Sequence, residues 1–281
     1  MNVKQLTWEE AVQWLRDQPD RQQLVRACYY DDPLQTAAER FSNSEEWQAV
    51  TQLLKDRIPG KALDIGAGRG ISSYAFARSG YCVTALEPNS SQIVGAGAIQ
   101  TIADNSSLPI SVVQEWGETL PFADNTFDVV YGRAVLHHAR DLNQLCKEAA
   151  RVLKPSGYFI ATREHVISKQ EDLQQFLDSH PLHSLYGGEN AYLLKQYTTA
   201  ISLAGLKIHR TIAPLENVIN YAPMTKTECQ NLFRPVSIRR LGHRLGSKLA
   251  DIKILQNLYI RYASNRLNSP GRLYSFLAVK P

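Results

Sequence analysis

The segment KALDIGAGRGI, residues 61–71, constrains the fold of this chain more than any other stretch. Its apolar residues indicate a strand buried on both faces, and the glycines at 66, 68 and 70 allow the chain to leave that strand in a tight turn. Residues 71–79 are typical of a helix. A strand, a glycine turn and a helix N-terminus present free backbone N–H groups and the positive end of a helix dipole. The segment therefore predicts a nucleotide-binding turn.

The spacing of the glycines argues against a dinucleotide. Here it is G-x-G-x-G, whereas dinucleotide-binding turns carry G-x-G-x-x-G. Asp64 stands two residues before the first glycine, where an acid repels a pyrophosphate and suits a cation such as an amino-acid ammonium. The next apolar run, residues 81–86, ends in Glu87, and an acid about twenty residues after such a loop can bind both ribose hydroxyls.

With these residues in place, the segment at 120–166, which begins LPFADNTFDVVYGRAVLHH, resembles the class I S-adenosylmethionine-dependent methyltransferases of the type 11 small-molecule branch. The resemblance covers residues 47–210. It implies an α/β fold with a Rossmann-like seven-stranded sheet whose last strand is antiparallel, a helical N-terminal lid and helical insertions. It also implies S-adenosyl-L-methionine as cofactor and S-adenosyl-L-homocysteine as product.

The resemblance assigns the cofactor site residue by residue. The implied cofactor-binding positions are Asp64, Gly66, Ala67, Gly68, Gly70, Glu87, Pro88, Trp116, Gly117, Glu118, Arg133 and His138. The family usually has an Asp for the adenine amino group where this chain has Trp116. Trp116 either borders the adenine, with Gly117 and Glu118 supplying contacts, or fills space beneath the adjacent helix.

The chain divides into four parts by pattern and charge. We expect a helical lid at residues 1–46, a cofactor-binding core at 47–213, a basic helical region at 214–271 and a final core strand at 272–281. From residue 226 to the end there are 11 Lys or Arg residues and 2 Asp or Glu residues. This asymmetry favours either an anionic partner or a solvated face on a helix packed against the core, and we prefer the second interpretation.

Predicted catalytic and substrate-binding residues follow the fifth strand or lie in the lid. That strand is expected at residues 158–162, so Glu164 and His165 would lie at its carboxyl end, where ligands bind in such sheets. His165 is the leading candidate base, His183 is its rival and Glu164 is an orienting acid. The predicted substrate-binding residues are Tyr30, Arg40, His180, Tyr186, Glu189 and Tyr192.

No metal site is predicted. His137 and His138 are adjacent at the expected start of a helix, where neighbouring side chains diverge by about 100° and do not easily share an ion. His138 is therefore assigned to the cofactor and His137 to a structural role. The four cysteines lie far apart, without metal-ligand spacing.

The predicted function is methyl transfer to a small molecule such as a natural product, glycan or quinone-like acceptor, with oxygen favoured because of the candidate histidine bases. One alternative acceptor is an anionic lipid-linked glycan or a nucleic acid, the latter disfavoured because no RNA-binding module is recognised. Another alternative is a non-enzymatic cofactor-binding module. The N-terminus has no leader pattern and no stretch is long enough to span a bilayer, so the expected location is cytoplasmic, with peripheral contact to an anionic surface left open.

Overall fold

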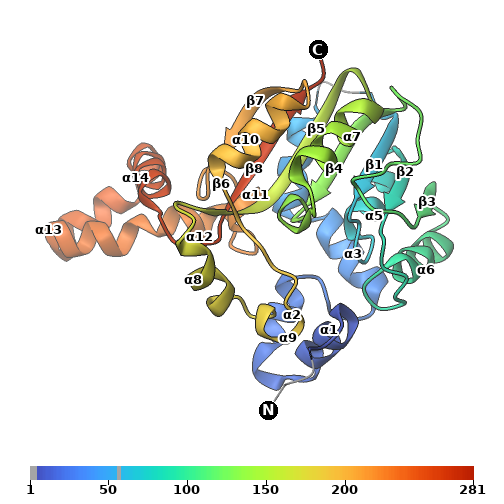
Figure 1. The fold of residues 1–281 in the computed structure, drawn as a ribbon. Coiled ribbons are helices and arrows are strands. Elements are labelled where there is room, and N and C mark those ends of the chain that lie inside the picture. Colours follow the sequence, from blue (N-terminus) through green and yellow to red (C-terminus); the bar gives the residue numbers. More distant parts are fainter. Residues whose placement is uncertain (1–4, 56–57) are drawn as a thin grey trace.

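The fold is built on one mixed sheet, in a computed structural model that describes residues 5–55 and 58–281 (Figure 1). Its strands are β1 (Lys61–Ile65), β2 (Cys82–Leu86), β3 (Ile110–Val113), β4 (Phe127–Arg133), β5 (Leu153–Ile167), β6 (Tyr192–Leu193), β7 (Lys207–Ile212) and β8 (Arg272–Val279). The order across the sheet is β3-β2-β1-β4-β5-β8-β7, with β6 paired to β5. Only the pairs that β8 makes with β5 and β7 are antiparallel, which confirms the predicted Rossmann-like sheet with an antiparallel last strand.

Helices cover both faces of the sheet. They are α1 (Trp8–Asp17), η1 (Pro19–Arg21), α2 (Gln22–Ala27), α3 (Leu34–Ser42), α4 (Glu45–Leu53), α5 (Ile71–Arg78), α6 (Ala96–Ser106), η2 (Leu136–His138), α7 (Leu142–Val152), α8 (Asp172–Ser179), α9 (His183–Tyr186), α10 (Leu194–Leu203), α11 (Val218–Tyr221), α12 (Lys226–Asn231), α13 (Phe233–Ala250) and α14 (Lys253–Arg266). Helices α7 and α10 pack on one face, whereas α3, α4, α5 and α11 pack on the other. Helices α1, α2 and α9 lie together at the N-terminal end of the molecule (Figure 1).

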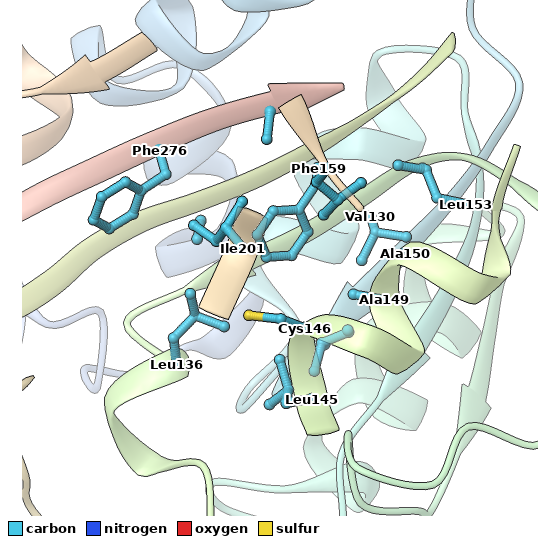
Figure 2. Packing of buried hydrophobic residues seen from close by; sticks show 14 of the residues in the cluster. Val130, Leu136, Leu145, Cys146, Ala149, Ala150, Leu153, Phe159, Ile201 and Phe276 are labelled. Atoms are coloured by element: carbon cyan, nitrogen blue, oxygen red, sulfur yellow. The ribbon is translucent and has the colours of Figure 1, made fainter. Parts of the chain in front are cut away.

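The core on the α7 side explains why the central strands are largely apolar. Figure 2 shows Phe159 and Val130 of the sheet beside Cys146 and Ala149 of α7 and Ile201 of α10. All five side chains are fully buried. Because parallel strands covered by helices on both faces have no solvated side, they carry continuous apolar runs. Burying each large apolar side chain contributes about 1.5–3 kcal/mol.

Helix α7 begins at a carboxylate cap. Asp141 Oδ1 accepts hydrogen bonds from the backbone N–H groups of Asn143, at 2.9 Å, and Gln144, at 3.0 Å. We expect Asp141→Ala to lower the free energy of unfolding by about 1 kcal/mol, because two N-terminal donors of the helix lose their partner. Urea unfolding measures this change. Asp141→Asn retains the side-chain oxygen and serves as the control; a loss as large as that of alanine would contradict the capping role.

Strand β5 is longer than the sequence predicted, and this corrects the expected position of two site residues. The expected strand, residues 158–162, extends to Ile167 because β8 continues to pair with it beyond a register shift between Ala161 and Glu164. At the shift, Arg163 has a φ of 63°, in the left-handed region. Glu164 and His165 therefore lie within a paired strand and not at its exit.

Two predicted helices have different limits in the structure. The sequence of residues 90–104 favours a helix that Gly95 and Gly97 weaken. In the structure α6 begins at Ala96 because Asn89 and Ser91 hold the preceding residues in turns: the Ser91 N–H donates to Asn89 Oδ1 at 2.9 Å and the Ala96 N–H to the Asn89 carbonyl at 2.7 Å. The expected helix at residues 140–153 begins at Leu142.

The N-terminal helix signals are confirmed. Thr7 and Glu10 form the predicted capping box of α1, and Ser44 caps α4, accepting from the Trp47 N–H at 3.1 Å. The helix predicted at residues 47–57 corresponds to α4, which ends at Leu53. Positions 56 and 57 of that prediction lie outside the described residues.

The basic helices do not pack along the core, contrary to our expectation. Helices α12, α13 and α14 pack on one another, and α13 and α14 project from the body of the protein (Figure 1). Leu245 and Tyr262 belong to an apolar stripe at helical spacing in the sequence, which favours packing on the core, yet they have exposed fractions of 53% and 58%. In the described part of the chain, no helix combines the length and apolar character needed to span a membrane.

Candidate active site

A cavity of about 540 Å³ lies at the carboxyl ends of β1, β2 and β4. The glycine turn borders one end of it, and residues of α1, α2, η2 and α9 border the other. Its volume falls within the range of about 300–1,000 Å³ typical of small-molecule sites. Parallel strands direct their carboxyl ends to the same edge of a sheet, which is why the glycine turn and the segment after β4 meet here.

Glu87 organises the glycine turn. Its Oε2 accepts from the Gly68 N–H at 2.9 Å, and its Oε1 accepts from the Asn89 N–H at 3.0 Å. Burial raises the pKa of the Glu87 carboxyl, although the two backbone donors oppose that shift. Gly66 requires glycine because its φ is 60° and a Cβ would lie 2.8 Å from a methyl group of Val135. The carboxylate therefore faces the cavity from a turn that its own hydrogen bonds hold in place.

Asp64 lies beneath the turn, which corrects its predicted contact with an ammonium group. The residue is buried, and its Oδ2 accepts from the hydroxyls of Ser72, at 2.7 Å, and Ser73, at 2.6 Å. Burial raises the pKa of Asp64 to about 6. Neither Asp64 nor Gly70 lines the cavity. Asp64 fixes the first turn of α5 and so positions the glycine turn from behind.

Trp116 borders the cavity and does not fill space beneath a helix. It is 44% exposed, and the guanidinium carbon of Arg140 lies 3.6 Å from its ring centroid. Glu118 Oε1 accepts from the Arg140 N–H at 2.8 Å, so the two segments hold each other in place. Trp116, Gly117 and Glu118 all line the cavity beside the glycine turn. This position supports the first of the two interpretations of Trp116.

Arg69 connects the segment after α2 to the glycine turn. Its Nη1 donates to the carbonyls of Tyr29, at 2.8 Å, and Asp31, at 3.0 Å, and its Nη2 donates to Asp32 Oδ1 at 2.5 Å. Arg40 binds the Asp31 carboxylate through two hydrogen bonds of 2.8 and 2.6 Å. Arg40 consequently does not line the cavity, which corrects its predicted contact with substrate.

Arg133 reaches the cavity from the end of β4 and is held by Glu46 of α4. Its Nε donates to Glu46 Oε1 at 2.7 Å and its Nη2 to Oε2 at 3.1 Å. Burial lowers the pKa of Arg133, but the attraction of Glu46 outweighs it and keeps the guanidinium charged. Glu46 is only 1% exposed, so each of these charges depends on the other for compensation.

Glu164 supports the η2 turn and does not face the cavity, which corrects its predicted catalytic role. Its carboxylate accepts from the backbone N–H groups of Val135, Leu136 and His137, at 3.1–3.2 Å. The ring Nδ1 of His137 lies 2.7 Å from Glu164 Oε2. Burial raises the pKa of Glu164 to about 7 even against the three backbone donors. Above neutral pH the carboxylate is an acceptor only, so we place the proton on His137 Nδ1.

Glu189 lies at the centre of a group of histidines. His137 Nε2 is 3.9 Å and His138 Nε2 is 4.0 Å from Glu189 Oε2. His180 Nδ1 is 3.7 Å from Oε1, and the Tyr186 hydroxyl donates to the same oxygen. Burial alone would raise the pKa of Glu189, but the neighbouring histidines and the tyrosine hydroxyl outweigh it and lower the pKa.

The histidines at 137 and 138 lie closer together than neighbouring positions of the expected α-helix would place them. The two residues lie in a 3-10 turn and not in an α-helix, and their ring centroids are 4.2 Å apart. Both therefore approach Glu189. His137 lines the cavity, although it was predicted to be structural only.

His165 lines the cavity but is poorly suited to be the predicted base. Its Nδ1 lies 2.8 Å from the Gly271 carbonyl, which can only accept, so that nitrogen carries the proton. Burial lowers the pKa of His165 to about 3. An imidazole that is so weakly basic removes a hydroxyl proton inefficiently at neutral pH.

Most of the residues predicted for the site line the cavity, and a few do not. His183 and Tyr192 do not line the cavity; the Tyr192 hydroxyl donates to the Ala139 carbonyl at 3.2 Å. The predicted residues that line it are Gly66, Ala67, Gly68, Glu87, Pro88, Trp116, Gly117, Glu118, Arg133, His138, Tyr30, His165, His180, Tyr186 and Glu189.

Sequence reasoning missed further lining residues, chiefly Trp8, Cys28, Arg163 and Leu273. Trp8 had a signal, because it shares a helical stripe with the buried residues Ala11, Val12 and Leu15. No sequence signal identified Arg163 as a lining residue, since its position in the cavity follows from the bulge in β5.

Comparison with known proteins gives a family for the core. Residues 63–161 match the sequence profile of a family described as "Methyltransferase domain". A demethylmenaquinone methyltransferase of Corynebacterium urealyticum is 37% identical over 119 residues, which cover 42% of this chain and 47% of that protein. A ubiquinone biosynthesis O-methyltransferase of Rhizobium etli is 33% identical over 103 residues, 36% of this chain and 40% of that protein. The chain thus spans about half the length of the curated relatives it matches.

Solved structures share the fold beyond this segment. Geranyl diphosphate C-methyltransferase from Streptomyces coelicolor A3(2) superposes with a TM-score of 0.57 at 15% identity, covering 83% of this chain and 78% of that one. At this identity the likeness concerns the fold alone.

Proposed function

We propose that this chain, whose residues 63–161 match a methyltransferase domain, is a class I S-adenosylmethionine-dependent methyltransferase that transfers the methyl group to a small-molecule acceptor. One observation carries the proposal. A single cavity is bordered at one end by the glycine turn with Glu87 and at the other by residues of the N-terminal helices and of the η2 turn. A donor and an acceptor bound at its two ends would share one enclosed space.

Methyl transfer chiefly requires that the acceptor atom, the methyl carbon and the sulfur are held in line. The acceptor atom attacks the methyl carbon, the carbon–sulfur bond breaks, and S-adenosylhomocysteine leaves with the electron pair. Holding two reactants in line supplies about 7–11 kcal/mol. Because His165 is too weakly basic at neutral pH to be an efficient general base, positioning within the cavity is the main catalytic contribution we assign to this chain.

The lining of the acceptor end favours a flat or partly apolar molecule. Trp8, Leu24, Leu182 and Leu273 contribute apolar surface, and Tyr186 contributes an aromatic ring. Two of the relatives named above act in quinone pathways according to their names. We therefore propose a phenolic or quinol-like acceptor with oxygen as the methylated atom.

The test is product formation. The protein is incubated with S-adenosylmethionine and, separately, with phenols, quinols and glycosides, and S-adenosylhomocysteine is measured by mass spectrometry. We expect release that depends on a phenol or quinol. Cofactor binding without transfer to any acceptor would contradict the proposal and favour a cofactor-binding module.

The projecting helices support a second proposal, that the protein meets its acceptor at an anionic surface. Helices α13 and α14 carry exposed apolar side chains, among them Leu245 and Leu258, next to exposed Arg239, Arg240 and Arg244. An anionic membrane surface attracts each nearby Lys or Arg by about 1 kcal/mol.

We expect the change of Arg239, Arg240 and Arg244 to Gln to weaken binding to vesicles of anionic phospholipid by roughly 10-fold or more. Sedimentation with the vesicles measures binding, and raised salt should weaken it further, because exposed charges are screened within about 10 Å at 0.1 M salt. The matched control changes Lys147, Lys195 and Lys207 to Gln, which removes the same charge elsewhere on the exposed surface. Equal losses in both variants would contradict a docking role for the projecting helices.

A further inference from the structure

We infer that His137, His165 and Glu189 form a binding site for a divalent first-row transition-metal ion at the acceptor end of the cavity. Each residue offers one ligand atom, and these atoms lie within 4.8 Å of one another. The three residues come from the η2 turn, from β5 and from the loop after α9, so only the folded chain brings them together. The consequence for catalysis rests on the proposed function, whereas the site itself does not.

The distances suit a bridging ion better than direct hydrogen bonds. His137 Nε2 and His180 Nδ1 lie 3.9 and 3.7 Å from oxygens of Glu189, beyond the range of a hydrogen bond. Ligand atoms bonded to one tetrahedral ion at about 2.0–2.1 Å lie about 3.3 Å apart. Small side-chain movements would therefore bring these atoms to an ion.

The outer contacts hold both imidazoles in the form that binds metals. His137 Nδ1 is hydrogen-bonded to the Glu164 carboxylate and His165 Nδ1 to the Gly271 carbonyl. These contacts place the protons on Nδ1 and leave the lone pairs of both Nε2 atoms available. Metal-binding histidines almost always donate their other ring N–H to a carboxylate or a carbonyl in this way.

The surroundings supply further support. Among the described residues, His180 Nδ1 is a buried atom with no hydrogen-bond partner, and it lies beside Glu189. His180 is therefore available as an additional ligand.

Two imidazoles and one carboxylate leave an open position, as in catalytic zinc sites. Imidazole nitrogens favour Zn²⁺, Co²⁺ and Fe²⁺ over Mg²⁺. A phenolic oxygen of the acceptor would occupy the open position as its oxyanion, after giving its proton to solvent. That oxygen would form the new bond to the methyl carbon while the carbon–sulfur bond breaks. The ion would lower the pKa of the acceptor hydroxyl.

The test uses the metal alone. The full chain is freed of metal with a chelator, dialysed, and titrated at pH 7.5 with Co²⁺ by visible absorption and with Zn²⁺ by calorimetry. We expect one ion per chain, visible cobalt bands, and affinity at least about 10-fold lower in His165→Ala and in Glu189→Gln. His209→Ala, which removes an exposed histidine from β7, should bind like the wild type.

Binding of S-adenosylmethionine is measured in every variant as a check of folding. If His165→Ala no longer binds S-adenosylmethionine, the metal affinity of the more conservative variant Glu189→Gln is compared with that of the wild type instead. Absence of saturable Co²⁺ and Zn²⁺ binding, or equal affinity in Glu189→Gln and the wild type, would overturn the metal site. Cofactor binding and methyl transfer that persist without metal would leave the proposed function intact, whereas metal binding without any methyl transfer would refute the proposed function alone.

Discussion

Replacing Glu87 with alanine is expected to weaken S-adenosylmethionine binding by about 30-fold or more, which corresponds to about 2 kcal/mol. Glu87 faces the cavity and accepts from the Gly68 and Asn89 N–H groups, so its carboxylate is fixed before the ribose arrives. Hydrogen bonds from ligand hydroxyls to such a charged acceptor are worth about 1.5–3 kcal/mol each. Isothermal titration calorimetry measures the change directly.

Two controls separate ligand contact from damage to the turn. Glu87→Gln retains an oxygen that can accept from the Gly68 N–H and should lose less affinity than alanine. Asp104→Ala removes an acid from the outer end of α6 and should change nothing. Because burial raises the pKa of Glu87, wild-type affinity should begin to fall, as the pH decreases, at a pH higher than that of an ordinary glutamate. Wild-type affinity in Glu87→Ala would remove this residue from the site.

Glu46→Ala is expected to lower the free energy of unfolding by about 3–5 kcal/mol. The substitution leaves the Arg133 guanidinium without its partner in a place where Glu46 is 1% exposed. The guanidinium also lies 5.6 Å from the ring centroid of Tyr29 and 5.4 Å from that of Phe41, so it cannot leave without disturbing the lid. Urea unfolding, followed by circular dichroism, measures the loss.

A double substitution tests whether the unpaired charge is the cause. Glu46→Leu combined with Arg133→Met replaces both charges by apolar groups and should recover much of the lost stability. Gln48→Ala, an exposed change on the same helix, should stay within about 0.5 kcal/mol of the wild type. A double variant as unstable as Glu46→Ala would show that packing, and not the unpaired charge, explains the loss.

The glycine turn was predictable because its determinants are local. Asp64, the three glycines and Glu87 lie within one strand–turn–helix–strand segment, and the turn needs positive φ at positions where only glycine is free to adopt it. The last strand was also predictable, since residues 272–279 alternate in the way of a strand, whereas its antiparallel direction followed from the family resemblance alone. The role of Asp64 was not, because its partners depend on how α5 packs against the sheet.

The structure of the acceptor end of the cavity could not be predicted, because it is determined by contacts between residues that are distant in the sequence. The extension of β5 comes from pairing with β8, more than 100 residues later, so Glu164 moved from the expected exit into the sheet. There it determines the shape of the η2 turn and brings His137 and His138 to Glu189, 51 or 52 residues further along the chain. The positions of the projecting helices α13 and α14 were likewise not predictable, because an apolar stripe on a helix does not specify which surface covers it.

A crystal structure of the full chain with S-adenosylhomocysteine tests the central claim most directly. We expect the ribose hydroxyls within hydrogen-bond distance of the Glu87 carboxylate and the sulfur directed to the end of the cavity where His137, His165 and Glu189 lie. The ligand bound away from the glycine turn, or with its sulfur turned from that end, would contradict it.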